Sequence, residues 1–225
     1  MKILVACEWS GTVRDAFRAR GHDAWSCDII PCEGDNTYHF QQDVIEIIYD
    51  GCWDMLIAHP PCTYLANSGV HWLHRQPGRW DKMVTASVFF KTFLSSGIPK
   101  ICVENPVMHG YAVSLIGEPY TQTIQPYDFG ENASKRTCLW LKSLPKLNST
   151  KFIEPVYHCK CGYNFVYSLG KYGCPDCGGE NGPARAIWEN QTPSGQNKLG
   201  PSPDRAKLRG RTYRGIAEAM AIQWG

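Results

Sequence analysis

Two short apolar runs each end near a residue that could do chemistry: the first leads to a cysteine, a possible nucleophile, and the second contains a glutamate, a possible proton donor. Cys62 ends the tetrapeptide HPPC, directly after the apolar run 55–58, and Glu104 lies near the end of the run 100–105. A thiolate is a strong nucleophile, the two prolines restrict the backbone before it, and a carboxyl group can exchange protons with a substrate. A packing thiol and an ordinary strand-end carboxylate are the competing interpretations.

A second group of cysteines has the spacing of a metal site. It reads C-x-C, twelve residues, then C-x-x-C, and a glycine follows each pair. The four thiolates would close a tetrahedral structural zinc site, which a segment with so few apolar residues needs in order to fold. Unbound thiols or another metal remain alternatives, and His158 is a weaker candidate ligand than Cys161. The four predicted ligands are Cys159, Cys161, Cys174 and Cys177.

The elements that must position Cys62 and Glu104 alternate between strands and helices. This alternation predicts a doubly wound, mostly parallel α/β sheet, in which ligands bind beyond the carboxyl ends of the strands. Both residues fall at such ends, as do Glu8 to Gly11 and Asp28. The predicted strands are 2–7, 23–30, 55–58 and 100–105, and the predicted helices are 12–20, ending before Gly21, and 79–96, with a short helix at the C-terminus.

Composition changes along the chain divide it into three parts. Residues 1–148 are expected to form the catalytic domain, and 149–186 a zinc ribbon that serves as a reduced target-recognition insertion. Residues 187–225 read as a linker, rich in Pro, Ser and Gly over 189–210, and a C-terminal helix that returns to the catalytic domain.

Charge and hydropathy narrow the class of protein. The N-terminus lacks the pattern of a signal peptide, and no stretch approaches the roughly 20 apolar residues of a membrane span, so a cytoplasmic protein is expected. The net charge of +2 gives no strong overall attraction to nucleic acid. Basic residues do cluster over 135–151 and 198–214. For each cluster, phosphate contacts and a solvated basic face are equally good interpretations.

The order and spacing of these motifs resemble the DNA cytosine-5 methyltransferase family over most of residues 1–140 and the C-terminal helix. HPPC resembles the family's Pro-Cys nucleophile loop, and ENP at 104–106 resembles its Glu-Asn-Val motif. YDFGENASKRTCLWL, residues 127–141, is similar to a degraded Gln-x-Arg-x-Arg motif, and GRTYRGIAEAMAIQW is similar to the last motif. The resemblance implies a Rossmann-like, S-adenosylmethionine-dependent methyltransferase fold, with DNA as partner. The sequence leaves the oligomeric state open, with a monomer slightly favoured. The compact chain suggests a viral or mobile-element origin in a bacterial cell.

The family mechanism implies a role for each matched residue. Cys62 would add to carbon 6 of a cytosine flipped out of the duplex, and Glu104 would hydrogen-bond N3 and the exocyclic amine. Asn105 would orient this carboxyl group. Arg136 or Lys135 would contact O2. The histidines near the loop, His59, His71 and His74, receive no role.

The resemblance also implies an S-adenosylmethionine site. Asp28 matches the residue that binds the ribose hydroxyls, and Asp43 the residue that contacts the adenine amine. The first loop reads ACEWSG where the family has F-x-G-x-G-G, so Trp9 would have to supply the stacking lost at Ala6. The predicted cofactor residues are Glu8, Trp9, Ser10, Gly11, Asp28, Ile29, Asp43, Val44, Pro60, Thr212 and Tyr213.

Two other functions fit the same residues. Cys62 and Glu104 would also serve cytosine carbon-5 modification of RNA or a free nucleotide, or a reaction with another one-carbon donor. A catalytically inactive nucleic-acid-binding protein is the third interpretation, and it needs neither residue. The short segment left for target recognition predicts a short or loose recognition sequence.

Overall fold

A seven-stranded, mostly parallel sheet forms the centre of the computed structural model, which describes residues 1–166, 173–179 and 184–225. The strand order is β3-β2-β1-β4-β5-β7-β6. Neighbouring strands from β3 to β5 are parallel, whereas β7 runs antiparallel to both β5 and β6. The chain builds outward from β1 on one side and then resumes at β4 on the other, so a topological switch point lies between β1 and β4. The strands are β1 (Lys2–Ala6), β2 (Asp23–Asp28), β3 (His39–Gln41), β4 (Met55–Ala58), β5 (Lys100–Pro106), β6 (Gln122–Ile124) and β7 (Thr137–Lys142).

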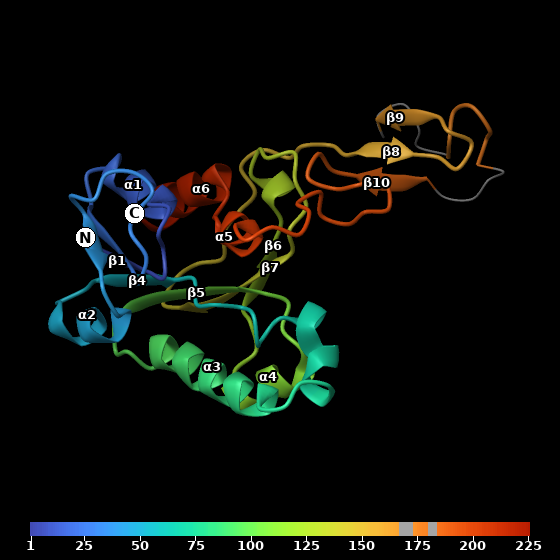
Figure 1. Cartoon of the computed structure of the whole chain (residues 1–225). Helices are drawn as coiled ribbons and strands as arrows, with labels where there is room; N and C mark the ends of the chain where they lie inside the picture. The colour runs from blue at the N-terminus through green and yellow to red at the C-terminus, as the bar shows by residue number, and fades with distance from the viewer. Residues whose placement is uncertain (167–172, 180–183) are drawn as a thin grey trace. The chain divides into compact units, whose positions relative to one another are not determined.

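Helices cover both faces of this sheet. Figure 1 shows α1 and α6 on one face and α2, α3 and α4 on the other. This arrangement confirms the predicted doubly wound α/β fold. The helices are α1 (Thr12–Arg18), α2 (Val44–Asp50), α3 (Arg79–Leu94), α4 (Gly110–Ile116) and α6 (Arg214–Trp224), and a 3₁₀ helix covers Asn67–His74.

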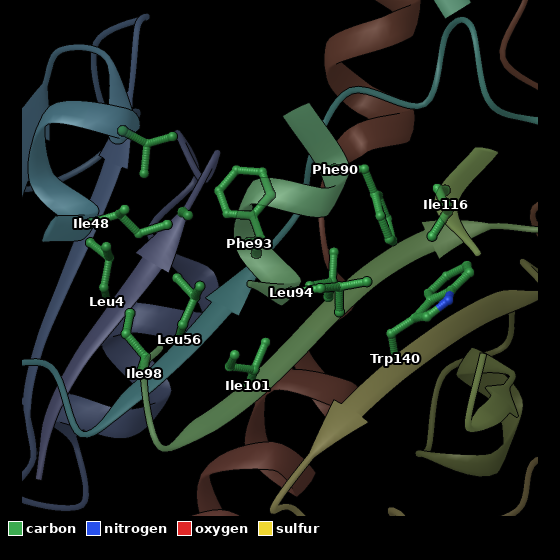
Figure 2. Packing of buried hydrophobic residues seen from close by; sticks show 14 of the residues in the cluster. Leu4, Ile48, Leu56, Phe90, Phe93, Leu94, Ile98, Ile101, Ile116 and Trp140 are labelled. Atoms are coloured by element: carbon green, nitrogen blue, oxygen red, sulfur yellow. The ribbon is translucent and has the colours of Figure 1, made fainter. Parts of the chain in front are cut away.

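Alternation along the strands supplies the two layers of core. Leu4 and Leu56 face α2, α3 and α4, whereas the intervening Ile3 and Ile57 are equally buried on the opposite side. Figure 2 shows the larger layer, where aromatic and branched side chains of α3 pack down onto β4, β5 and β7. Phe90 of α3 meets Trp140 of β7 edge to face, with ring centroids 4.9 Å apart.

We expect Phe90→Ala to lower the free energy of unfolding by about 3–5 kcal/mol, because it removes a fully buried ring and leaves a cavity beside Trp140. Urea denaturation followed by tryptophan fluorescence measures this loss. Val88→Ala on the same helix is the matched control. Val88 is 60% exposed, and its replacement should cost less than about 0.5 kcal/mol. Equal losses in the two variants would contradict the assigned core.

Several predicted elements agree closely with the structure. The first helix ends at Arg18, and Gly21 (φ 84°) donates its N–H to the Arg18 carbonyl at 2.9 Å, as expected of a glycine that stops a helix. The second strand ends at Asp28, two residues before its expected end. Elements without a strong hydrophobic period, namely β3, α2, α4, β6 and β7, were not predicted as elements.

The chain divides into two compact units. The first contains the seven-stranded sheet and comprises 1–124, 136–148 and 210–225. The second comprises 125–135 and 149–209. The second unit has a three-stranded antiparallel sheet of β8 (Val156–His158), β9 (Asn164–Val166) and β10 (Arg185–Ile187), together with a 3₁₀ helix over Pro126–Asp128 and α5 (Arg205–Gly210). Within the expected linker 189–210, the structure places α5 and a turn in which the Thr192 N–H donates to the Gln196 carbonyl at 2.7 Å and the Gln196 N–H donates to the Thr192 hydroxyl at 3.1 Å.

Among the residues that the structure describes, none of the helices has the length and apolar character needed to cross a lipid bilayer.

Candidate active site and metal centre

The carboxyl ends of β1, β4 and β5 lie side by side at one edge of the sheet. In the parallel register Ala6 is paired with Ala58, and Ala58 with Val103. The residues that follow these positions are the loop 7–11, the HPPC stretch and Glu104. The switch point between β1 and β4 therefore falls where the sequence predicts the reacting groups.

The side chain of Glu104 meets a histidine at this edge. His59 Nδ1 lies 3.2 Å from Glu104 Oε2, and the two side chains are only 6% and 13% exposed. The backbone N–H of His59 donates to the Ala6 carbonyl at 2.9 Å, which ties the end of β4 to that of β1. Sequence analysis assigned His59 no role, because a lone histidine beside a loop carries no signal of its partner 45 residues away.

The loop that carries Cys62 is fixed to the end of β5 and the segment after it by four hydrogen bonds. Asn105 Nδ2 donates to the Pro60 carbonyl at 3.0 Å. Beyond the cysteine, the Asn67 N–H donates to the Val107 carbonyl at 2.8 Å and the His109 N–H to the Leu65 carbonyl at 3.1 Å. The fourth bond joins the His109 ring to the Tyr64 carbonyl at 3.0 Å. The Cys62 loop and the Glu104 strand thus form one braced structure.

His109 can make this contact because its two ring nitrogens have different partners. Its Nδ1 accepts the Ala112 N–H at 3.2 Å and so caps the N-terminus of α4. The acceptor role of Nδ1 leaves the proton on Nε2, which donates to Tyr64. The residue is 3% exposed. Sequence analysis missed it, although a polar residue immediately before a helix is a capping signal.

Asn105 braces the loop from inside the protein. It is 1% exposed and alternates with Glu104 along β5, so the two side chains leave opposite faces of the strand. The amide is therefore directed to Pro60, whereas the sequence-based expectation was that it orients the Glu104 carboxyl group.

We expect Asn105→Ala to lower the free energy of unfolding by about 1–3 kcal/mol, because the Pro60 carbonyl loses its buried donor. Chemical denaturation measures the change. Asn67→Ala is the control, since Asn67 contacts Val107 through its backbone, which alanine keeps, and its loss should stay within about 0.5 kcal/mol. A neutral Asn105→Ala would show that the bond to Pro60 contributes nothing.

Cys62 itself lies in a tight turn. Its carbonyl accepts the N–H groups of Leu65 and Ala66 at 3.0 and 2.9 Å, and its side chain is partly exposed. Arg79, at the start of α3, donates to the Thr63 carbonyl at 3.1 Å and lies over the Tyr64 ring. The thiol is thus held on a short, well-supported backbone rather than within the core.

The first loop closes around a buried carboxylate. Glu8 is 4% exposed, and its two oxygens accept the N–H groups of Val13 and Arg14 at 2.6 and 3.2 Å, at the N-terminus of α1. Burial raises the pKa of Glu8, while His59 and these two donors act in the opposite direction. The side chain therefore occupies the end of the helix, where a phosphate-binding loop would place an anion.

Two residues of the loop have backbone angles in the left-handed region. Gly11, at the N-cap of α1, has φ 71°, and a Cβ there would lie 2.5 Å from the Arg14 guanidinium. Cys7 has φ 57°, which is uncommon for a residue with a side chain. Burial raises the pKa of the Cys7 thiol far above its usual value, and the nearby Asp28 adds to this. Cys7 is therefore a packing thiol beneath the loop.

Trp9 is covered by the C-terminal segment rather than open to solvent. It is 8% exposed, its carbonyl accepts the Glu33 N–H at 2.9 Å, and the Arg211 guanidinium lies 5.3 Å from its ring. Arg211 also forms an ion pair with Glu33. Ser10 bonds to the Thr12 hydroxyl at 3.0 Å. Nothing in the sequence indicated that Glu33 and Arg211 would meet, because they lie in segments far apart in the chain.

The other predicted cofactor residues of the sheet unit lie at strand and helix ends. Asp28 ends β2, accepts the Ile30 N–H at 3.1 Å, and has a pKa raised by burial, whereas the next residue, Ile29, is 74% exposed. Asp43 is exposed and caps α2 by accepting the Ile45 N–H at 3.0 Å. Val44 is in the core. Of the later residues, Tyr213 is the N-cap of α6, and Thr212, which precedes it, is partly buried.

The two predicted basic residues fall in different units. Arg136 is exposed and directly precedes β7, whose Thr137 pairs with Pro106 at the end of the Glu104 strand. Burial raises the pKa of Cys138 on this strand, and the charges of Glu104 and Arg136 influence it with opposite signs. Lys135 belongs to the second unit, where its N–H donates to Gln125.

The four predicted metal ligands converge in the second unit. The sulfurs of Cys159, Cys161, Cys174 and Cys177 all lie within 4.8 Å of one another, and two of the pairs are separated by 3.6 Å. A tetrahedron with metal–sulfur bonds of about 2.3 Å has sulfurs about 3.8 Å apart, so the cluster has the dimensions of a four-thiolate site. These four residues could therefore hold a metal ion.

Local turns explain how the unusual C-x-C pair reaches this geometry. The Gly162 N–H donates to the Cys159 carbonyl at 3.0 Å, and Gly162 has φ 95°, which reverses the chain immediately after Cys161. Gly178 plays the same part after Cys177, with φ 59°. Among the residues that the structure describes in this segment, few apolar side chains surround the cluster, chiefly Phe165 and Tyr157.

A groove of about 490 Å³ lies between α1 and α6. Its walls include Ala16, Arg20 and the ion pair of Arg214 with Glu218. None of the predicted site residues lines it. The candidate active site is therefore placed at the strand ends and not in this groove.

Comparisons with solved structures find proteins of similar fold. No protein-family model and no curated protein matches the chain. Among solved structures, a candidate DNA modification methyltransferase encoded within a prophage of E. coli is similar, with 18% sequence identity and a TM-score of 0.44. The match covers 77% of this chain and 55% of that chain, so the chain spans little more than half the length of that protein. A likeness at this level concerns the fold alone.

Proposed function

We propose that this chain transfers a methyl group from S-adenosylmethionine to carbon 5 of cytosine in DNA, through a covalent adduct with Cys62. The observation that carries the proposal is the braced pair of Cys62 and Glu104. A loop with a partly exposed thiol and a strand end with a buried carboxyl group are joined by four hydrogen bonds at one edge of the sheet. A packing thiol and an ordinary surface carboxylate would need no such support.

The first step assigned to the chain is nucleophilic addition. The Cys62 thiolate forms a bond to carbon 6 of cytosine, and the electron pair of the 5,6 double bond moves toward carbon 5 and the ring. Glu104 donates a proton to N3 as negative charge develops there. Carbon 5 becomes nucleophilic as a result. Once carbon 5 carries the methyl group, a base takes its proton, the bond between carbon 6 and the Cys62 sulfur breaks, and N3 returns its proton to Glu104. These changes restore the aromatic ring and regenerate both Cys62 and Glu104.

The first loop fits a nucleoside cofactor that lacks phosphates. Glu8 already satisfies the N–H groups at the start of α1, and its carboxylate would repel a pyrophosphate there. Asp28 ends the second strand, where an acidic residue of a nucleotide-binding sheet bonds ribose hydroxyls. The exposed Ile29 beside it provides an apolar surface for a base. S-adenosylmethionine, when bound, supplies an electrophilic methyl group on a positively charged sulfur.

The remaining predicted residues keep their proposed roles. Arg136 is exposed next to the end of the Glu104 strand, where it would contact O2 of the flipped base. Lys135 is the alternative for that contact. Trp9, Ser10, Gly11, Asp43, Val44, Pro60, Thr212 and Tyr213 remain the proposed surroundings of the cofactor. DNA phosphates would be met by the basic clusters over 135–151 and 198–214.

Zinc is the metal we propose for the four-cysteine cluster. Four thiolate ligands in a tetrahedron favour zinc over harder cations, and a site closed by four protein ligands leaves no position for a substrate. The role of the metal is therefore structural.

The decisive experiment traps the adduct. Duplex DNA containing 5-fluorocytosine is incubated with the protein and radiolabelled S-adenosylmethionine, because fluorine at carbon 5 blocks the final elimination. The expected result is a labelled protein–DNA complex that resists denaturant, with the linkage mapped to Cys62 by peptide mass spectrometry. Parallel reactions use fluorinated RNA and a free fluorinated nucleotide. If only the RNA or only the free nucleotide is trapped, that molecule is the substrate in place of DNA. If none of the three is trapped and none receives a methyl group, the proposal is refuted.

A further inference from the structure

His59 is the residue of the candidate site whose environment sequence analysis did not anticipate. It stands three positions before Cys62, at the end of β4, and its side chain is 6% exposed. The Nδ1 edge of the imidazole contacts Glu104, with Nδ1 3.2 Å from Oε2. A buried histidine whose ring contacts a carboxyl group requires an explanation beyond packing.

The contacts of the two ring nitrogens indicate which one carries the proton. Within the described ranges, Nε2 is buried and makes no hydrogen bond. A proton on Nε2 would therefore create a buried N–H donor without an acceptor, which costs about 1–3 kcal/mol. A proton on Nδ1 instead donates directly to Glu104. The carboxylate oxygens of Glu8 already accept two backbone N–H groups and do not provide that acceptor.

We propose that His59 is the positioning residue for Glu104: its neutral ring donates Nδ1–H to Oε2 and so holds the other oxygen, Oε1, as the one that carries the proton for cytosine N3. This inference rests on the proposed function. It assigns to His59 the role that the family resemblance implied for Asn105, whose amide bonds to Pro60 in this chain. Asn105 and His59 then have separate roles: Asn105 holds the loop of Cys62, and His59 holds the carboxyl group of Glu104.

Two substitutions distinguish this role from simple packing. Asparagine places an amide nitrogen close to the position of Nδ1 and can still donate to Glu104. Glutamine carries the same group one carbon farther, close to the position of Nε2. We expect His59→Gln to lower kcat for methyl transfer about 10²-fold with KM for DNA nearly unchanged, and His59→Asn to recover to within about 10-fold of the unmodified protein. His71→Asn, on the exposed 3₁₀ helix, is the control and should leave both constants unchanged.

The outcomes separate the inference from the proposed function. Three results would overturn the role of His59 while Cys62 still forms its adduct. They are equal losses in the asparagine and glutamine variants, a normal kcat in the glutamine variant, and an effect confined to KM. Failure of the unmodified protein to form any adduct would refute the function instead.

A measurement on the resting protein tests the same contact without turnover. Nitrogen-15 NMR of the labelled histidine rings reports which ring nitrogen is protonated. We expect His59 to be neutral with its proton on Nδ1, and Glu104→Gln to shift its resonances. A proton on Nε2, or spectra of His59 that do not change in Glu104→Gln, would overturn the inference even if every variant at position 59 failed to fold.

Discussion

Replacement of Cys62 by alanine is expected to abolish adduct formation and to lower methyl transfer at least about 10³-fold, because the other thiol at these strand ends, Cys7, has a pKa raised by burial and would not form the attacking thiolate. The loss should be entirely in kcat. Cys62 lies in a turn whose bonds to Leu65 and Ala66 are made by its backbone, which alanine retains. DNA affinity, measured by fluorescence anisotropy, and thermal stability should therefore stay close to those of the unmodified protein.

The matched control for this experiment is Cys52→Ala. Cys52 is exposed in the loop before β4 and contributes nothing to the proposed site, so trapping on fluorinated DNA should proceed at the normal rate. Undiminished methyl transfer by Cys62→Ala would contradict the covalent mechanism. The protein would then be acting by direct attack on a methyl donor, and Glu104 would need another role.

Removal of the proposed zinc is expected to unfold the four-cysteine segment. Metal binding to such sites contributes about 10–16 kcal/mol in small zinc domains, and the described residues of this segment bury too few apolar side chains to replace that contribution. Chelation, or Cys174→Ala at the buried ligand, should eliminate bound zinc in native mass spectrometry and expose residues 149–209 to limited proteolysis. The seven-stranded sheet has its own core, so its cooperative unfolding transition should persist.

His158→Ala provides the control for the metal site. His158 ends β8 next to Cys159 but lies outside the group of four converging ligands. This variant should retain one zinc ion per chain. Loss of zinc from His158→Ala together with its retention in Cys161→Ala would show that the histidine is a ligand in place of that cysteine.

The predictions from sequence succeeded where short local patterns carry the information. Apolar runs of four to eight residues followed by polar loops placed β1, β2, β4 and β5, and parallel pairing then required Cys62 and Glu104 to lie at one edge. The spacing of the cysteine pairs and their following glycines predicted a cluster that the structure confirms as a group of four. In each case the signal lies within a few neighbouring residues.

The contacts inside the site could not be predicted in this way. The capping of α1 by Glu8 depends on how the loop turns at Gly11, and the bonds of His59 to Glu104 and Asn105 to Pro60 each span 45 residues. Such partners are chosen by side-chain direction after the strands pair. A single sequence contains no local record of that choice.

The sequence by itself therefore determined four of the seven strands, the edge of the sheet at which the chemistry is proposed and the cluster of four cysteines, because period, turn residues and spacing act over short distances. Only the tertiary structure decided which group supports which. Glu104 and Asn105 are neighbours on β5, so their side chains must leave by opposite faces of the strand. Asn105 therefore bonds to the nucleophile loop, and His59 is the residue that bonds to the Glu104 carboxyl group. The tertiary structure also fills the helix end with Glu8, because a buried N-terminus requires an acceptor and this carboxylate is the one within reach.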